Sequence, residues 1–196
     1  VVHKRSALER VGNVVEVAGR TRIIEYSDLP AEIAERRNAG GTLELWAGSL
    51  AVHAFDLKFL ATQAAEADSL PLHRALKKVA WIDGNGKTIE PTEPNALKFE
   101  RFIFDLLPSA RRAMVVEVAG ADAFAPVKNA SHETFDTAET ARAAMIEKDA
   151  QLLRAAGAVV SDGIPVEVNP LWALDASEAA KKIASGLTIT GPTYFS

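Results

Sequence analysis

The sequence predicts a mixed α/β protein. Two stretches rich in valine and isoleucine, 11–17 and 22–26, alternate in part between apolar and polar residues, and Ala18-Gly19 between them indicates the turn of a β-hairpin. Farther along, 137–157 has the spacing of a long helix, with a capping threonine at its start and a glycine at its end. Strand-like and helix-like patterns alternate through the rest of the 196 residues without a repeat or long linker, so we expect one α/β unit.

The first half of the chain is expected to contain short elements. VVHK at the start resembles the end of a strand, and because proteins seldom begin inside a strand, we expect residues upstream of Val1. After the hairpin, Ser27 or Asp28 can cap a short helix that takes Pro30 in its first turn. The next expected elements are a strand over 43–47 and a helix that is capped by Asp56, with Leu57, Leu60 and Ala64 on its apolar face.

The second half is expected to be richer in helix. The stretch 70–79, LPLHRALKKV, has the composition of a short basic helix, and a hairpin is expected around Gly84-Asn85-Gly86. Apolar residues at helical spacing predict a helix over 95–107 that Pro108 ends. The remaining expected elements are a buried strand over 114–118, the long helix, a strand and turn over 165–174, and a short helix over 176–184.

Composition excludes several classes of function. The net charge is −4 and the basic residues are interleaved with acids, which argues against a nucleic-acid surface. No apolar run approaches the ~20 residues of a membrane span, and the N-terminus lacks the pattern of a signal peptide. With no cysteine and four scattered histidines, the chain shows no disulfide framework and no metal signature. We expect a cytoplasmic protein without a nucleic-acid or membrane partner; its oligomeric state stays open.

Generic catalytic motifs such as HExxH, GxSxG and the phosphate loop are absent from the sequence. Seven unusual strings stand in their place, spread along the chain in this order: IEYSDL (24–29), WAGSLAVHAFDLKFL (46–60), HRALKKVAWID (73–83), PNALKFERFIFDLL (94–107), FAPVKNA (124–130), DTAETAR (136–142) and VEVNPL (166–171). In their order and spacing they resemble the C-terminal half of the UDP-sugar pyrophosphorylase family, and within it most nearly the UDP-N-acetylglucosamine pyrophosphorylase branch. The resemblance covers almost the whole chain and weakens after Gly157.

The resemblance implies a nucleotidyltransferase that joins UTP and a sugar 1-phosphate, releasing pyrophosphate and a UDP-sugar. It implies a Rossmann-like mixed sheet of the nucleotide-diphospho-sugar transferase type, flanked by helices on both faces. Residues 1–157 would be the sugar-binding part of the catalytic domain, and 158–196 a terminal strand and helix extension of the same unit. The triphosphate loop and most ligands of the Mg²⁺ cofactor would lie in the missing N-terminal half, so the chain alone should be inactive.

Individual positions can be matched to the family's sugar-binding residues. Gly12 matches a glycine whose backbone lies against the sugar, although a strand-end glycine explains it equally well. Glu25 matches an acid that accepts hydrogen bonds from sugar hydroxyls. Tyr26 follows it and would point to the other sheet face, where it can belong to the core.

The AGS string, which contains Gly48 and Ser49, departs from the family's AGN. The asparagine is expected to bond the sugar, and serine is shorter, so preference for the N-acetylated sugar is put in doubt. His53 matches a histidine near the site, with a structural role as the alternative. Phe102 and Phe104 match aromatics of the sugar pocket, one of which can instead belong to the core.

Lys128 matches the lysine that reaches the phosphates at the transfer centre, where an ammonium group can neutralise charge on the α-phosphate. Pro126 would stiffen its loop and Asn129 would fasten it by a bond from side chain to backbone. Without the resemblance, a solvated loop lysine would be the simpler interpretation. Asp105 is expected to take part in a salt bridge.

Three hypotheses therefore stand. The first is a uridylyltransferase that makes UDP-N-acetylglucosamine. The second keeps the chemistry but changes the sugar to glucose or galactose, because of Ser49. The third is a non-catalytic relative that binds UDP-sugars or regulates a partner.

Overall fold

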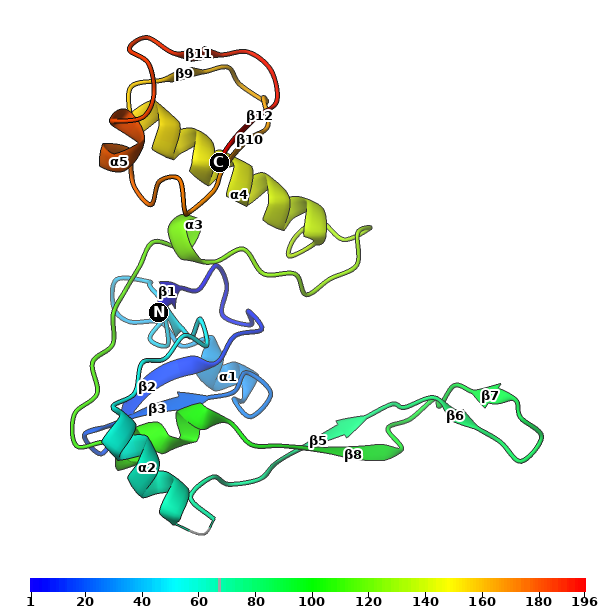
Figure 1. Cartoon of the computed structure of the whole chain (residues 1–196). Helices are drawn as coiled ribbons and strands as arrows, with labels where there is room; N and C mark the ends of the chain where they lie inside the picture. Colours follow the sequence, from blue (N-terminus) through cyan, green and yellow to red (C-terminus); the bar gives the residue numbers. More distant parts are fainter. Residues whose placement is uncertain (67) are drawn as a thin grey trace. The chain divides into compact units, whose positions relative to one another are not determined.

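The computed structural model describes residues 1–66 and 68–196 and contains both helices and strands, so the predicted mixed α/β class is confirmed (Figure 1). The chain divides into two units, Val1–Glu117 and Val118–Ser196, which are described separately. The expected division after Gly157 falls inside the second unit and stays a prediction.

A four-stranded antiparallel sheet forms the centre of the first unit. Its strand order is β1-β4-β2-β3, from β1 (Val2–His3), β4 (Ala47–Gly48), β2 (Asn13–Val17) and β3 (Arg20–Ile24). The hairpin between β2 and β3 is confirmed, since Ala18 (φ 51°) and Gly19 (φ 72°) both take the left-handed conformation that a tight two-residue turn requires. The strand expected at the start of the chain is also confirmed.

Helix α1 is shorter than expected and is capped differently. It spans Ala31–Ala34, and Pro30 stands at the N-cap without a side-chain hydrogen bond, so capping by Ser27 or Asp28 is wrong. The strand expected over 43–47 is reduced to Ala47 of β4 and an isolated bridge between Arg37 and Leu43.

Helix α2 (Leu57–Ala65) has the predicted cap, because the Asp56 carboxylate accepts hydrogen bonds from the backbone N–H groups of Lys58 (2.8 Å) and Phe59 (3.1 Å). The predicted apolar face is wrong at Leu57 and Ala64, which are both exposed. Leu57 is 81% exposed, whereas Gln63 is the buried residue of the helix.

Residues 73–100 form an arm of two antiparallel ribbons, which Figure 1 shows leading away from β2 and β3. Strand β5 (His73–Lys77) pairs with β8 (Ala96–Glu100), and β6 (Trp81–Ile82) pairs with β7 (Thr88–Ile89) around the predicted Gly84–Gly86 turn. The helices expected over 70–79 and 95–107 are therefore wrong where these residues form β5 and β8. Pairing across the ribbon overrides local helix propensity in both segments.

The remainder of the second expected helix is a 3₁₀ helix, η1 (Ile103–Ser109), which contains Pro108 and lies against β3. Its Phe104 and Leu106 side chains are buried. The expected buried strand over 114–118 is also wrong. Met114 and Val116 are 86% and 56% exposed, and none of the strand ladders among the described residues includes this segment. The amino group of Val1 donates a hydrogen bond to the Val116 carbonyl oxygen (2.6 Å).

In the second unit, α3 (Gly120–Ala123) precedes the long helix α4 (Ala138–Ala155). Helix α4 begins as predicted, because Thr137 and Thr140 form a reciprocal capping box, and Gly157 follows it at φ 99°. The other elements are β9 (Val159–Val160) parallel to β11 (Thr188–Ile189), β10 (Val166–Val168) parallel to β12 (Thr193–Phe195), and α5 (Ala176–Ala180).

The core of this unit surrounds Leu153 of α4, which is fully buried together with Val166 and Ala179. The strand expected within 165–174 is confirmed as β10, and the final short helix is confirmed over Ala176–Ala180, shorter than the expected 176–184. Within the described part of the chain, none of the helices has both the length and the apolar character that crossing a bilayer requires.

Candidate functional site

Gly12, Glu25 and Ser49 lie together at the end of the first unit's sheet. The Ser49 N–H donates to the Gly12 carbonyl (2.8 Å), so the two loops are joined through their main chains. A Cβ atom placed on Gly12 would stand 3.1 Å from Glu25 Oε1 and 3.6 Å from Ser49 Cβ. The nearest atom to that Cβ would be Ile23 Cγ2 (2.7 Å), and Gly12 itself is buried, so the missing side chain lets its backbone pack closely against β3. Glu25 and Ser49, beside it, are only partly buried, and their carboxylate and hydroxyl can hydrogen-bond a polyhydroxylated ligand.

Glu25 follows β3 and is half-buried. Burial raises the pKa of its carboxyl, and the nearby charge of Asp28 raises it further, while the charge of His73 opposes both. Glu25 is thus an acid whose ionisation depends on its neighbours.

Gly48 and Ser49 have different surroundings. Gly48 is buried in β4, where an added Cβ would approach Val11 Cγ2 (3.1 Å) and Lys4 Cγ (3.3 Å). The Ser49 hydroxyl accepts a hydrogen bond from the Ala51 N–H (3.2 Å), which leaves its own hydrogen to donate. Of the two, Ser49 is the residue with a polar group to offer.

Tyr26 does not belong to the core. Strand β3 ends at Ile24, and the Tyr26 side chain, two residues later, is 45% exposed. Side chains alternate between the two faces of a sheet only within a strand, so the alternation that predicted a buried Tyr26 does not extend beyond Ile24.

The two phenylalanines expected at the site belong to a series of aromatic rings. Phe102 stacks on Phe104, with centroids 4.8 Å apart, and the His53 ring lies 6.3 Å from Phe104. Phe104 is buried, whereas Phe102 is only partly covered. Burial lowers the pKa of His53, which favours the neutral imidazole. The structure therefore gives Phe104 a place in the core and leaves part of Phe102 accessible.

His73 and Asp28 were not expected at this site, and Asp105 was expected only to form a salt bridge. His73 Nε2 lies 2.7 Å from Asp105 Oδ2, and His73 Nδ1 lies 3.5 Å from Asp28 Oδ2. The salt bridge expected for Asp105 is confirmed. The sequence signal was weak, because these residues are far apart along the chain and only their charges suggest a pairing.

Lys128 belongs to the second unit, in a loop that is held by hydrogen bonds to the backbone of residues 135 and 136. The N–H groups of Lys128 and Asn129 both donate to the Asp136 carbonyl oxygen (2.7 and 2.9 Å), and the Asn129 amide donates to the Phe135 carbonyl (2.9 Å). The predicted role of Asn129 is thus confirmed. The ammonium group of Lys128 lies over the Phe124 ring, 5.5 Å from its centroid. The exposed side chain is therefore carried by a fixed backbone.

No protein-family model matches the chain. It is 37% identical over 158 residues to UDP-N-acetylhexosamine pyrophosphorylase-like protein 1 of Xenopus tropicalis, which covers 80% of this chain and 31% of that protein. It is 36% identical over 172 residues to the UDP-N-acetylglucosamine pyrophosphorylase of Saccharomyces cerevisiae, covering 86% of this chain and 36% of the relative. The chain spans about a third of the length of these curated relatives.

A solved structure gives the same result. The chain superposes on a crystal structure of an Entamoeba histolytica protein that is assigned to the UDP-N-acetylglucosamine pyrophosphorylases, with a TM-score of 0.82 and 27% identity. The match covers 100% of this chain and 48% of that one. Sequence and structure agree, and the chain belongs to the UDP-sugar pyrophosphorylase family, in the branch of the UDP-N-acetylglucosamine pyrophosphorylases.

Proposed function

We propose that the chain is the sugar-binding part of a uridylyltransferase that joins UTP and N-acetylglucosamine 1-phosphate to give UDP-N-acetylglucosamine and pyrophosphate. The observation that carries the proposal is the meeting of Gly12, Glu25 and Ser49, where close packing at Gly12 brings the Glu25 carboxylate and the hydroxyl-bearing side chain of Ser49 to the same end of the sheet. These are the groups that a hexose with several hydroxyls requires. The names of the relatives support the same reaction.

In the proposed reaction, an oxygen of the sugar phosphate attacks the α-phosphorus of UTP, the bond to the β-phosphate oxygen breaks, and pyrophosphate leaves. Catalysis then consists mainly of positioning and charge neutralisation. Glu25 would accept hydrogen bonds from sugar hydroxyls, and Phe102 would pack on the sugar or its acetyl methyl group. Lys128 would neutralise charge that develops on the α-phosphate.

The finer features of the fold and cofactor belong to this proposal. The complete domain would be a Rossmann-like mixed sheet, with Mg²⁺ bound to the phosphates, where it neutralises charge. Among the described residues, no group of three or more histidine or acidic side chains is gathered to hold a metal ion. We propose that the metal ligands come mainly from outside this chain and that the 196 residues alone are inactive. We also propose that the enzyme works in the cytoplasm.

The test is an assay of the polypeptide that the whole gene encodes. With UTP and N-acetylglucosamine 1-phosphate, pyrophosphate release and UDP-sugar formation are expected in equal amounts. Ser49 favours one alternative, a glucose 1-phosphate uridylyltransferase, because serine is shorter than the asparagine of the family's string. A kcat/KM for glucose 1-phosphate equal to or above that for the N-acetylated sugar would establish this alternative. Binding of UDP-sugar without turnover would instead indicate a non-catalytic relative.

A further inference from the structure

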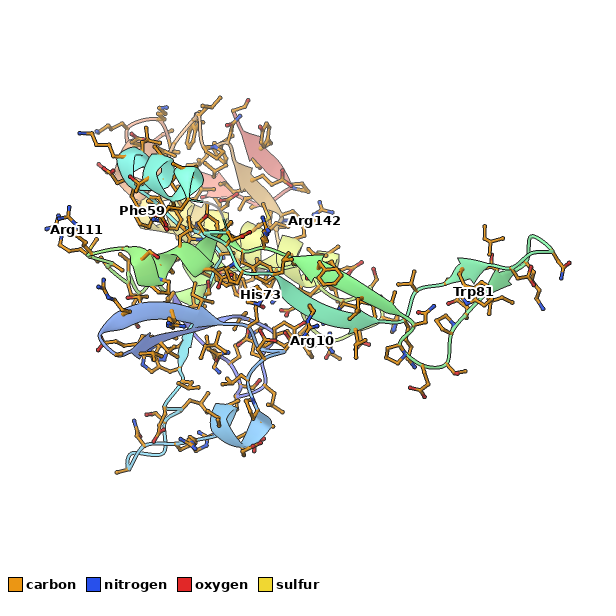
Figure 2. All side chains as sticks on the ribbon, turned by 90° about the horizontal axis from the view of Figure 1, so that it is seen from below. Arg10, Phe59, His73, Trp81, Arg111 and Arg142 are labelled. Atoms are coloured by element: carbon orange, nitrogen blue, oxygen red, sulfur yellow. The ribbon has the colours of Figure 1, made fainter. Side chains whose placement is uncertain are left out.

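His73 is the point at which three segments of the first unit meet. It begins β5, at the root of the arm whose outer ribbon carries Trp81 (Figure 2). Its Nε2 atom is 2.7 Å from the Asp105 carboxylate in η1, and its Nδ1 atom faces the Asp28 carboxylate at 3.5 Å. The ring also lies 4.9 Å from the Phe102 ring, measured between centroids. One imidazole therefore contacts an acid on each side and an aromatic ring.

Each of the two acids is joined to a residue of the candidate sugar site. The Asp28 N–H donates to the Glu25 carbonyl (3.0 Å), so Asp28 closes the turn that carries Glu25. The Asp105 N–H donates to the Phe102 carbonyl (3.0 Å), so Asp105 belongs to the turn that carries Phe102. The imidazole thus bridges the two turns from which the carboxylate and the aromatic side of the site project.

Only the doubly protonated ring can donate to both carboxylates, since a neutral imidazole has one N–H group. The acids that surround it are Asp28, Asp105, Glu25 and Glu100, the last of which is the β-ladder partner of His73. Burial lowers the pKa of His73, but the hydrogen bond and charge of Asp105, followed by those of Asp28, outweigh burial and raise it overall. The positive charge also helps to keep Glu25 ionised as a hydrogen-bond acceptor.

We propose that His73 is a positioning residue for the sugar 1-phosphate: by holding Asp28 and Asp105 at once, its imidazolium fixes the separation between Glu25 and Phe102. The inference rests on the proposed function, because it concerns the binding of that substrate. Loss of the bridge would let the two turns move independently. It would thus weaken binding of the sugar and leave the nucleotide contacts unchanged.

The test uses the polypeptide that the whole gene encodes and measures kcat and the KM of each substrate. In His73→Gln, the KM for the sugar 1-phosphate is expected to rise roughly tenfold, while the KM for UTP and kcat change by less than about threefold. Asp105→Asn, which removes the stronger partner, should behave in the same way, and the double variant should be no worse than either single one. Arg74→Gln is the matched control, because Arg74 is the exposed neighbour of His73 on the same strand.

A pH series separates positioning from a merely structural role. The ratio of the sugar KM in His73→Gln to that in the wild type should fall toward one as the pH rises above the ordinary histidine pKa of about 6.5 and the wild-type ring loses its second proton. The proposal is overturned if the sugar KM of a folded His73→Gln enzyme stays within about twofold of wild type, or if both KM values rise by the same factor. If His73→Gln does not fold, the same two criteria for the KM values are applied to Asp105→Asn, and they support or overturn the proposal in the same way. If the wild-type enzyme turns over none of the sugar 1-phosphates, the proposed function itself fails and the inference falls with it.

Discussion

Phe102 and Phe104 lie with their rings nearly parallel, at 10° between planes and 4.8 Å between centroids, although only one residue separates them. Phe104 is 8% exposed and forms the lower layer, while Phe102 lies above it beside His73. The stack shows a buried residue, Phe104, supporting a ring that is partly exposed.

Phe104→Ala should therefore lower the stability of the first unit by about 3 kcal/mol, because it leaves a cavity under Phe102. Phe102→Ala should lower the stability by about half as much, since that side chain is already partly exposed. Urea unfolding can be followed by tryptophan fluorescence in a Trp172→Phe background, so that only Trp46 and Trp81 of the first unit report. Equal losses for the two variants would contradict this layering.

Gly12→Ala should disturb both the sheet and the site. The new methyl would stand 2.7 Å from Cγ2 of the buried Ile23, which must shift, and 3.1 Å from Glu25 Oε1, which must yield by a few tenths of an ångström. In the complete enzyme, we expect a rise of roughly tenfold in the KM for the sugar 1-phosphate. Gly84→Ala is the control, because an added Cβ there meets nothing within 4 Å. An unchanged KM would exclude Gly12 from the sugar contact.

Lys128→Ala should lower kcat of the complete enzyme by about a hundredfold or more, as expected when a group that stabilises developing negative charge is removed. Lys128→Arg should recover only part of the activity, because a planar guanidinium does not place its charge as an ammonium does. Lys181→Ala, an exposed lysine of the same unit, is the control. A loss below about threefold, or less than ~1 kcal/mol of barrier, would remove Lys128 from the mechanism.

His73 should make the stability of the chain depend on pH. Burial lowers its pKa, but the hydrogen bonds and charges of Asp105 and Asp28 raise it overall above the ordinary value of about 6.5. The folded state then binds the proton more tightly than the unfolded state. The stabilisation is complete below the unfolded pKa and is lost as the pH rises through the folded one.

The free energy of unfolding of the chain should accordingly exceed that of His73→Gln most at about pH 5.5, and the difference should shrink by about pH 8.5. His132→Gln is the control, because the His132 side chain is 82% exposed. A difference that stays constant across this range would show that the imidazole acts only by packing.

Parts of the fold that depend on neighbouring residues were predictable from the sequence. The β2–β3 hairpin follows from its turn, and helices α2 and α4 begin where Asp56 and Thr137 cap them. In each case the decisive contact lies within a few residues, so the local string contains the necessary information.

Segments that depend on distant partners were not predictable in the same way. His73–Lys77 is a strand because it pairs with Ala96–Glu100, about twenty residues away, and neither string specifies that pairing. The site shows the same limit. The approach of Gly12 to Glu25 follows from the pairing of the hairpin strands. The bridge from Asp28 through His73 to Asp105 joins three segments that are far apart in the sequence, so it appears only in three dimensions.

The arm formed by 73–100 also has a consequence for stability. Its two ribbons pair chiefly within themselves, and most of their side chains are exposed, from Leu76 (68%) to Ile82 (70%). Insertions or deletions near the Gly84–Gly86 tip thus change few packed contacts, and longer loops close at small additional entropic cost. A change of length at this tip should therefore cost the chain little stability, whereas a change next to His73 would disturb its contacts with Asp28 and Asp105.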